Sequence, residues 1–195
     1  MNNYRKTLPW GGISLFIVVC AALVWNCGDK GTNPATTLQD LYFTTQITGW
    51  VPDSGSHFIE NPPNDLYGPM NGSAPPYVSA GLVSWFREKM YGGPTATSLG
   101  GEYAFIGYVM DFGTIANAKS FFDAKAALAI QPADKVPLPS FTDNEAQAKP
   151  GSGGVMVYAT FGKYYFEFPV MGYSVTADAV TEALKFLDKY KATVR

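Results

Sequence analysis

The first thirty or so residues differ in character from the rest, and they decide which part of the chain can form a globular fold. Arg5 and Lys6 precede an apolar run from Ile13 to Trp25, and a polar stretch rich in small residues follows it. A basic start and an apolar core of roughly 7–15 residues are typical of a secretory signal. The sequence therefore predicts an exported protein whose domain forms from the residues after about position 30.

Cys27 lies where the apolar run gives way to the polar stretch. The segment resembles a bacterial lipoprotein signal peptide, in which this cysteine is lipidated and becomes the new N-terminus. We therefore expect a signal peptide over 1–26, a flexible tether over 27–36 and a lipid anchor in a membrane of the cell envelope, inner or outer. Trp25 and Asn26 depart from the usual small residue before the cysteine. An uncleaved membrane anchor is the alternative, although a spanning helix needs about 20 apolar residues.

The two cysteines both belong to this segment. Cys20 lies inside the apolar run and is the alternative lipidation site. Neither is available to the domain after the tether, so that domain has no disulfide. Its stability must come from burial and hydrogen bonding.

Residues 37–195 suffice for one core-forming domain and are too few for two ordinary ones. Fourteen basic against sixteen acidic residues leave a net charge of −2, and no basic stripe would attract nucleic acid. His57 is the only histidine in the sequence and lies in a Pro/Gly/Ser-rich segment. A zinc site with several histidine ligands is therefore excluded. We expect no metal, no cofactor and no nucleic-acid partner.

The periodicity predicts an α+β domain with an antiparallel sheet and helices packed on one face. Gly162-Lys163 separates two alternating segments in the manner of a tight hairpin. Thr114 is the expected N-cap of a helix that would bury Ile115, Ala118, Phe122 and Ala126. Ser174 or Thr176 is the expected N-cap of the terminal helix. The predicted strands span 81–91, 102–112, 154–161 and 164–171, and the predicted helices span 115–128 and the C-terminal residues from about 176.

These elements form two strand–strand–helix units of similar sequence. Phe105 matches Phe166, Val109 matches Val170 and Ala118 matches Ala179, all at one offset. The domain is therefore either two ββα half-repeats or two such units that share composition by chance. Either arrangement needs helices to cover the sheet.

Residues 66–77 follow the pattern L-Y-x-x-x-N-G-x-A-x-x-Y, with Gly49-Trp50 upstream and Gly81-Leu82 downstream. The periodicity places Leu66, Met70, Ala74 and Tyr77 on one helical face, and Pro75-Pro76 predicts a kink or two short helices. On this pattern the chain resembles, over most of residues 45–190, a family of uncharacterised exported bacterial proteins. The resemblance implies an exported location and a fold, and it assigns no activity.

We expect a non-catalytic binding or interaction module of the cell envelope, with an envelope protein or a small ligand as its partner. Tyr67, Asn71 and Tyr77 are the candidate ligand-binding residues, with helix packing as their alternative role. A second hypothesis is a small hydrolase that uses Asp111 and Glu167, which requires two carboxyl groups about 5–10 Å apart across a cleft. A third is a passive structural component of the envelope.

Overall fold

The computed structural model describes residues 35–44, 46–53, 58–93 and 105–194. The predictions for Cys20, Cys27 and His57 lie outside these ranges. Thr36–Arg195 forms one compact unit. The described residues of this unit form two hydrophobic clusters, which begin at Leu38 and at Leu66.

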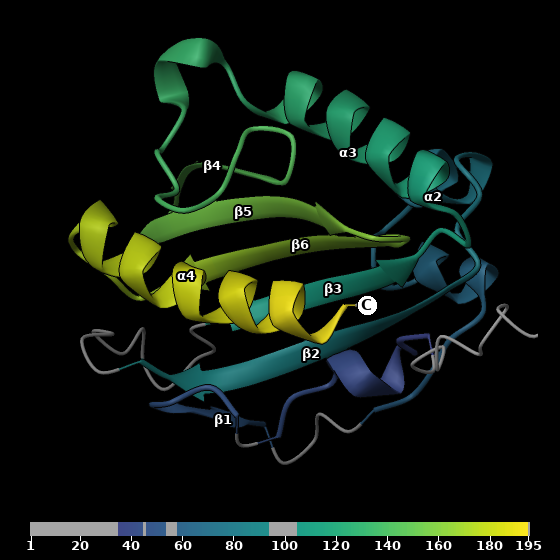
Figure 1. Ribbon diagram of the computed structural model, residues 1–195, viewed down its shortest axis with the longest axis horizontal. Helices are drawn as coiled ribbons and strands as arrows, with labels where there is room; N and C mark the ends of the chain where they lie inside the picture. The colour runs from purple at the N-terminus through teal and green to yellow at the C-terminus, as the bar shows by residue number, and fades with distance from the viewer. Residues whose placement is uncertain (1–34, 45, 54–57, 94–104, 195) are drawn as a thin grey trace, which may run out of the picture. The chain divides into compact units, whose positions relative to one another are not determined.

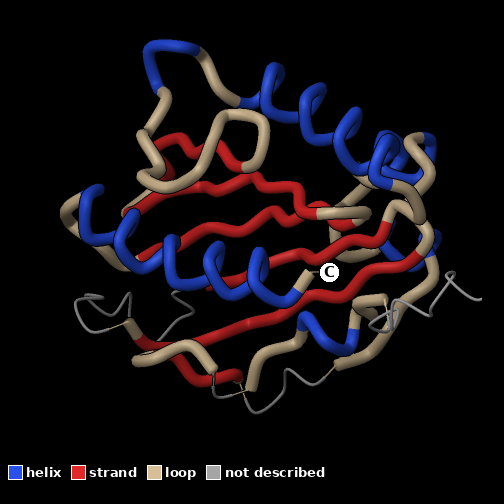
Figure 2. The backbone as a smooth tube through the Cα atoms, viewed as in Figure 1, coloured by secondary structure: helices blue, strands red, loops and turns tan. Residues whose placement is uncertain are grey.

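Within the described residues, six antiparallel strands form one sheet in the order β1-β2-β3-β6-β5-β4, with three α-helices packed around it (Figures 1 and 2). The α+β class is confirmed. The strands are β1 (Trp50–Pro52), β2 (Ser84–Gly92), β3 (Phe105–Asp111), β4 (Ala146–Gly151), β5 (Gly154–Phe161) and β6 (Tyr164–Met171). The helices are α2 (Pro75–Ser79), α3 (Ile115–Ala129) and α4 (Thr176–Thr193), with 3₁₀ turns η1 (Gln39–Leu41), η2 (Pro63–Tyr67) and η3 (Pro132–Asp134).

Local sequence explains several boundaries. Gly162 has φ +57° at the first position of the two-residue turn between β5 and β6, where a glycine tolerates the left-handed region. Both of these strands have the bounds that the hairpin pattern predicts. The Thr114 hydroxyl accepts a hydrogen bond from the Asn117 N–H and caps α3 as expected. The terminal helix begins after Val175 and has no side-chain cap.

The helices cover both faces of the sheet, which corrects the expectation of a single covered face. Neighbouring residues of a strand point to opposite faces. Phe166 and Phe168 of β6 belong to the cluster that α4 completes with Phe186, whereas Tyr165 packs with Phe121 of α3. The sheet is therefore the middle of three layers.

The two ββα units are alike in how their strands are buried and differ in the helices that follow. Phe105 and Phe166 lie in the same cluster, but Ala118 and Ala179 lie in different clusters. If the two units were related by a two-fold axis, that axis would run normal to the sheet, because β3 and β6 are antiparallel neighbours. Such an axis would place the two helices on the same face of the sheet, and the observed helices lie on opposite faces. The turns account for the difference, because the positive-φ glycine follows Phe112 in the first unit and precedes Tyr173 in the second.

The segment with the family-like pattern forms two short elements, η2 and α2, which is one of the two arrangements expected from Pro75-Pro76. Asn71 and Gly72 separate them with φ of +47° and +83°. Leu66, Ala74 and Tyr77 are buried as the periodicity predicts. Ile115, predicted to point inward, is instead 69% exposed, because it is the first residue of α3 and no described element covers it.

Gly49-Trp50 serves the core on the α4 side. Trp50 is buried, and its Nε1 donates a hydrogen bond of 2.8 Å to the Glu182 carboxylate, which Lys185 also contacts at 2.7 Å. Gly49 has φ +85°. A Cβ added to Gly92 would lie only 2.3 Å from the Gly49 carbonyl oxygen, so the two backbones approach closely. The pair therefore fixes β1 against β2 and α4. Among the described residues, no helix is long and apolar enough to cross a bilayer.

Candidate ligand-binding groove

A groove of about 810 Å³ runs between α2 and α3, on the face of the sheet opposite α4. Small-molecule pockets are commonly about 300–1,000 Å³ in volume. Its walls are mostly proline, alanine, leucine and aromatic side chains, with hydroxyls and one amide between them. From the α2 side it is lined by Gly72, Ser73, Pro75, Pro76, Tyr77, Ser79 and Ala80, and from α3 by Asn117, Ser120, Phe121, Ala124, Lys125, Leu128 and Ala129.

The α3 wall follows from helical spacing. Asn117, Ser120, Ala124 and Leu128 are three or four residues apart and therefore lie along one stripe of the helix. The opposite stripe, with Ala118, Phe122 and Ala126, is buried against the sheet. Leu128 is 83% exposed and adds apolar surface at the edge of the groove.

A polar cluster lies where the groove meets the sheet. Tyr77 Oη donates to Glu167 Oε2 at 2.8 Å, and Tyr165 Oη donates to the same oxygen at 2.9 Å. Lys125 Nζ donates to Tyr77 Oη at 2.6 Å and lies 3.3 Å from Glu167 Oε2. Lys125 also lies 4.9 Å from the centre of the Tyr77 ring. The lysine and the carboxylate therefore neutralise each other.

Burial controls the ionisation of the phenols around this cluster. Desolvation, and then the Glu167 charge, raises the pKa of Tyr77 above its usual 10, and the same two causes raise the pKa of Tyr158 to about 12. Desolvation also raises the pKa of the buried Tyr165 well above its usual value. All three stay protonated at neutral pH and act as hydrogen-bond donors. None is poised as a base or nucleophile, which would need a lowered pKa.

Of the three candidate ligand-binding residues, the structure places Tyr77 in the wall of the groove. Asn71 is exposed and forms the turn beside Gly72, which itself lines the groove. Tyr67 is 43% exposed and lies outside the lining. The sequence pattern thus led to one wall of the groove, and its assignment as a ligand site stays a prediction.

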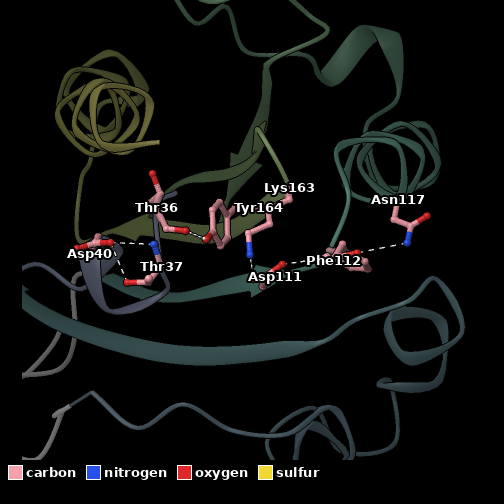
Figure 3. A network of polar contacts seen from close by, with 9 residues as sticks. Thr36, Thr37, Asp40, Asp111, Phe112, Asn117, Lys163 and Tyr164 are labelled. Carbon is pink, nitrogen blue, oxygen red and sulfur yellow. Dashed lines mark hydrogen bonds and ion pairs between the residues drawn. The ribbon is translucent and has the colours of Figure 1, made fainter. Parts of the chain in front are cut away.

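Asp111 and Glu167 do not converge. Asp111 pairs across the sheet with Tyr164, in the register of the α4 face, whereas Glu167 pairs with Tyr108 and faces the groove side. Asp111 instead accepts a hydrogen bond of 2.7 Å from the Gly113 N–H and pairs with Lys163 at 2.5 Å (Figure 3). It fixes the turn after β3. The geometry that a two-carboxylate hydrolase needs is absent from this pair.

A further carboxylate that the sequence analysis did not single out lies in the core. Glu88 of β2 is fully buried among residues of the α4-side cluster, and neither of its oxygens makes a hydrogen bond of normal geometry. Desolvation raises its pKa to about 8, and the nearby Phe43 N–H and Tyr190 hydroxyl only partly oppose the shift. No group of three or more potential metal ligands occurs within the described ranges.

The chain matches no known family and no curated protein. The resemblance to exported bacterial proteins therefore stays a prediction. Among solved structures, the extracellular domain of PknH from Mycobacterium tuberculosis is similar with a TM-score of 0.42 and 14% identity, over 81% of this chain and 93% of that one. A likeness of this size carries no argument about function.

Proposed function

We propose that the protein is an envelope lipoprotein, anchored through Cys27, whose domain is a non-catalytic binding module. The groove between α2 and α3 is its ligand site. The observation that carries the proposal is the groove itself, a concave and mainly apolar surface of ligand size whose lysine is paired with Glu167.

The pairing and protonation of the described groups at the groove support binding over chemistry at this site. Lys125 is paired with Glu167, and the phenols near them hold their protons. Enzyme sites instead place acids and bases whose pKa values are shifted toward the working pH. The exposed Leu128 and the apolar wall beside it favour a ligand that contributes apolar surface.

The proposal is tested by titrating the soluble domain, beginning at Thr36, with the uncharged fluorescent probe N-phenylnaphthylamine. Ala124 is exposed and lines the groove, whereas Ala127 is exposed on the same helix outside the lining. Ala124→Trp should weaken probe binding roughly tenfold or more, a loss of at least about 1.4 kcal/mol. Ala127→Trp, the matched control, should leave it unchanged. Equal binding by both variants would remove the groove as the ligand site.

The anchor is tested separately in the full chain. Wild-type protein and Cys27→Ala are expressed with a radiolabelled fatty acid, and the label on the purified protein is measured. We expect the label to disappear in the variant. Persistent labelling would show that Cys27 is not the sole lipidated residue, and Cys20→Ala would then identify the alternative.

A further inference from the structure

We propose that the groove takes an acyl chain of a lipid from the membrane in which the protein is anchored. This inference rests on the proposed function and deepens it by naming the ligand class and its source. It follows from where the chain leaves the domain, from the length of the tether and from the charge state of the groove.

The first residue of the compact unit lies at the end of the sheet from which α3 starts. The Tyr164 hydroxyl donates to the Thr36 carbonyl oxygen. The neighbouring Lys163 accepts from the Phe112 N–H through its carbonyl oxygen at 3.0 Å, and Asn117 Nδ2 donates to the Phe112 carbonyl oxygen at 3.3 Å (Figure 3). Since Asn117 lines the groove, this chain of contacts joins the tether exit to one end of the groove.

The tether is short. Nine residue steps separate Cys27 from Thr36. At a maximum of about 3.3–3.6 Å per residue, Thr36 can lie no further than about 32 Å from Cys27. A lipid on Cys27 would therefore keep the end of the domain that carries Thr36, and with it the Asn117 end of the groove, within reach of the bilayer.

This same end presents apolar side chains to solvent. Val83, just before β2, is 52% exposed, and Ile115, at the start of α3, is 69% exposed. Val83 and the turn at Gly113 are close together, since the Val83 N–H donates to Asp111 O at 2.7 Å and a Cβ on Gly113 would lie 3.0 Å from Val83 Cγ2. Lys163, a third exposed as a side chain, lies beside them and is paired with Asp111. Exposed apolar residues on one end of a domain suit contact with a lipid surface.

The charge state of the groove selects the apolar part of the lipid. Lys125, its only lining cation, is already neutralised by Glu167 and donates to Tyr77. A phosphate or a free carboxylate would have to compete with this pair, whereas an alkyl chain needs only the apolar wall formed by Phe121, Ala124 and Leu128. An acyl chain can enter from the bilayer at the Asn117 end while its headgroup stays at the surface.

The test uses the full lipidated chain in vesicles of phosphatidylethanolamine and phosphatidylglycerol that contain a trace of phospholipid with a diazirine on one acyl chain. After irradiation, adducts are mapped by peptide mass spectrometry. We expect adducts on α3 residues of the groove wall, reduced roughly tenfold in Ala124→Trp and unchanged in Ala127→Trp. Adducts confined to the apolar end around Val83 and Ile115, or equal in the two variants, would overturn the proposal.

The two proposals fail in different ways. If the soluble domain binds N-phenylnaphthylamine in the groove but the photoactivatable acyl chain does not label it, the groove binds another apolar ligand and the acyl-chain proposal is wrong. If neither reagent reaches the groove, the binding function itself is wrong. Displacement of the bound probe by free fatty acid but not by vesicles would assign the alkyl chain to a source other than the membrane, and would also overturn the proposal.

Discussion

Replacing Glu88 by glutamine should stabilise the domain, and the gain should grow with pH. Glu88 is fully buried on β2, on the same face as Phe86 and Met90, and its carboxylate oxygens have no hydrogen bond of normal geometry. Tyr42, Tyr190 and the Phe43 backbone surround it, and no cation faces it among the groups that shift its pKa. Ionisation of Glu88 is therefore costly in the folded state.

The magnitude follows from the pKa shift. The folded pKa is about 8 against an ordinary value of 4.5. Between these values the folded protein keeps a proton that the unfolded chain releases, so stability falls as pH rises, by up to about 1.4 kcal/mol per pH unit. The accumulated loss is about 3 kcal/mol at pH 7 and about 5 kcal/mol above pH 9. Below pH 4 it vanishes, because Glu88 is protonated in both states.

Urea unfolding of the soluble domain at pH 4.5, 6, 7 and 8 measures this directly. Glutamine is nearly isosteric with the protonated acid, so wild type and Glu88→Gln should have similar free energies of unfolding at pH 4.5 and separate progressively above it. Glu60→Gln, an exposed site, controls for the loss of one carboxylate. A variant that is less stable than wild type at pH 7, or a difference that does not change with pH, would show that ionisation of Glu88 costs the folded protein nothing.

Further substitutions test the charge of the groove, the β5–β6 hairpin and the cap of α3. Glu167→Gln removes the charge that neutralises Lys125. The affinity for the anionic probe anilinonaphthalene sulfonate should then rise roughly fivefold relative to the affinity for uncharged N-phenylnaphthylamine, corresponding to about 1 kcal/mol of charge interaction. An unchanged ratio of the two affinities would contradict the neutralisation of Lys125 by Glu167. Gly154→Ala should destabilise the domain by about 3 kcal/mol in urea unfolding, because its Cβ would lie 1.8 Å from a carbonyl oxygen of β6; a loss under about 1 kcal/mol would show that the hairpin yields easily. Thr114→Ala should lower the free energy of unfolding in urea by about 1 kcal/mol, because it removes the cap of α3. Ser174→Ala removes no side-chain cap and should leave the free energy of unfolding almost unchanged. Equal losses in the two variants would contradict the assignment of Thr114 as the cap.

The strands were predictable because their determinants are local. The alternation of side chains and the Gly162-Lys163 pair predict β5 and β6 with their observed bounds. Thr114 likewise predicts the start of α3. The face that each helix covers depends on where a single positive-φ glycine falls relative to an aromatic residue, and the similarity of the two units concealed that difference.

The groove and the buried acid depend on contacts between distant parts of the chain. Tyr77 was recognisable from its sequence pattern, but Lys125 and Glu167 meet it only through the packing of α2 and α3 on the sheet. The two-residue period places Glu88 inward with Phe86 and Met90, a signal that could have drawn attention to it. The lack of a countercharge could not be predicted, because its neighbours Phe43 and Tyr190 come from the η1 side and from α4.

The proposed binding function requires the surface between α2 and α3 to hold an apolar ligand. Methyl NMR spectra of the soluble domain, recorded with and without dodecan-1-ol as an uncharged alkyl chain, test it most directly. We expect saturable shifts of the Ala124, Ala129 and Leu128 methyl signals, with the Ala183 and Leu187 methyls of the α4-side core unchanged. Shifts confined to the α4 side, or no saturable shift in the groove, would contradict it.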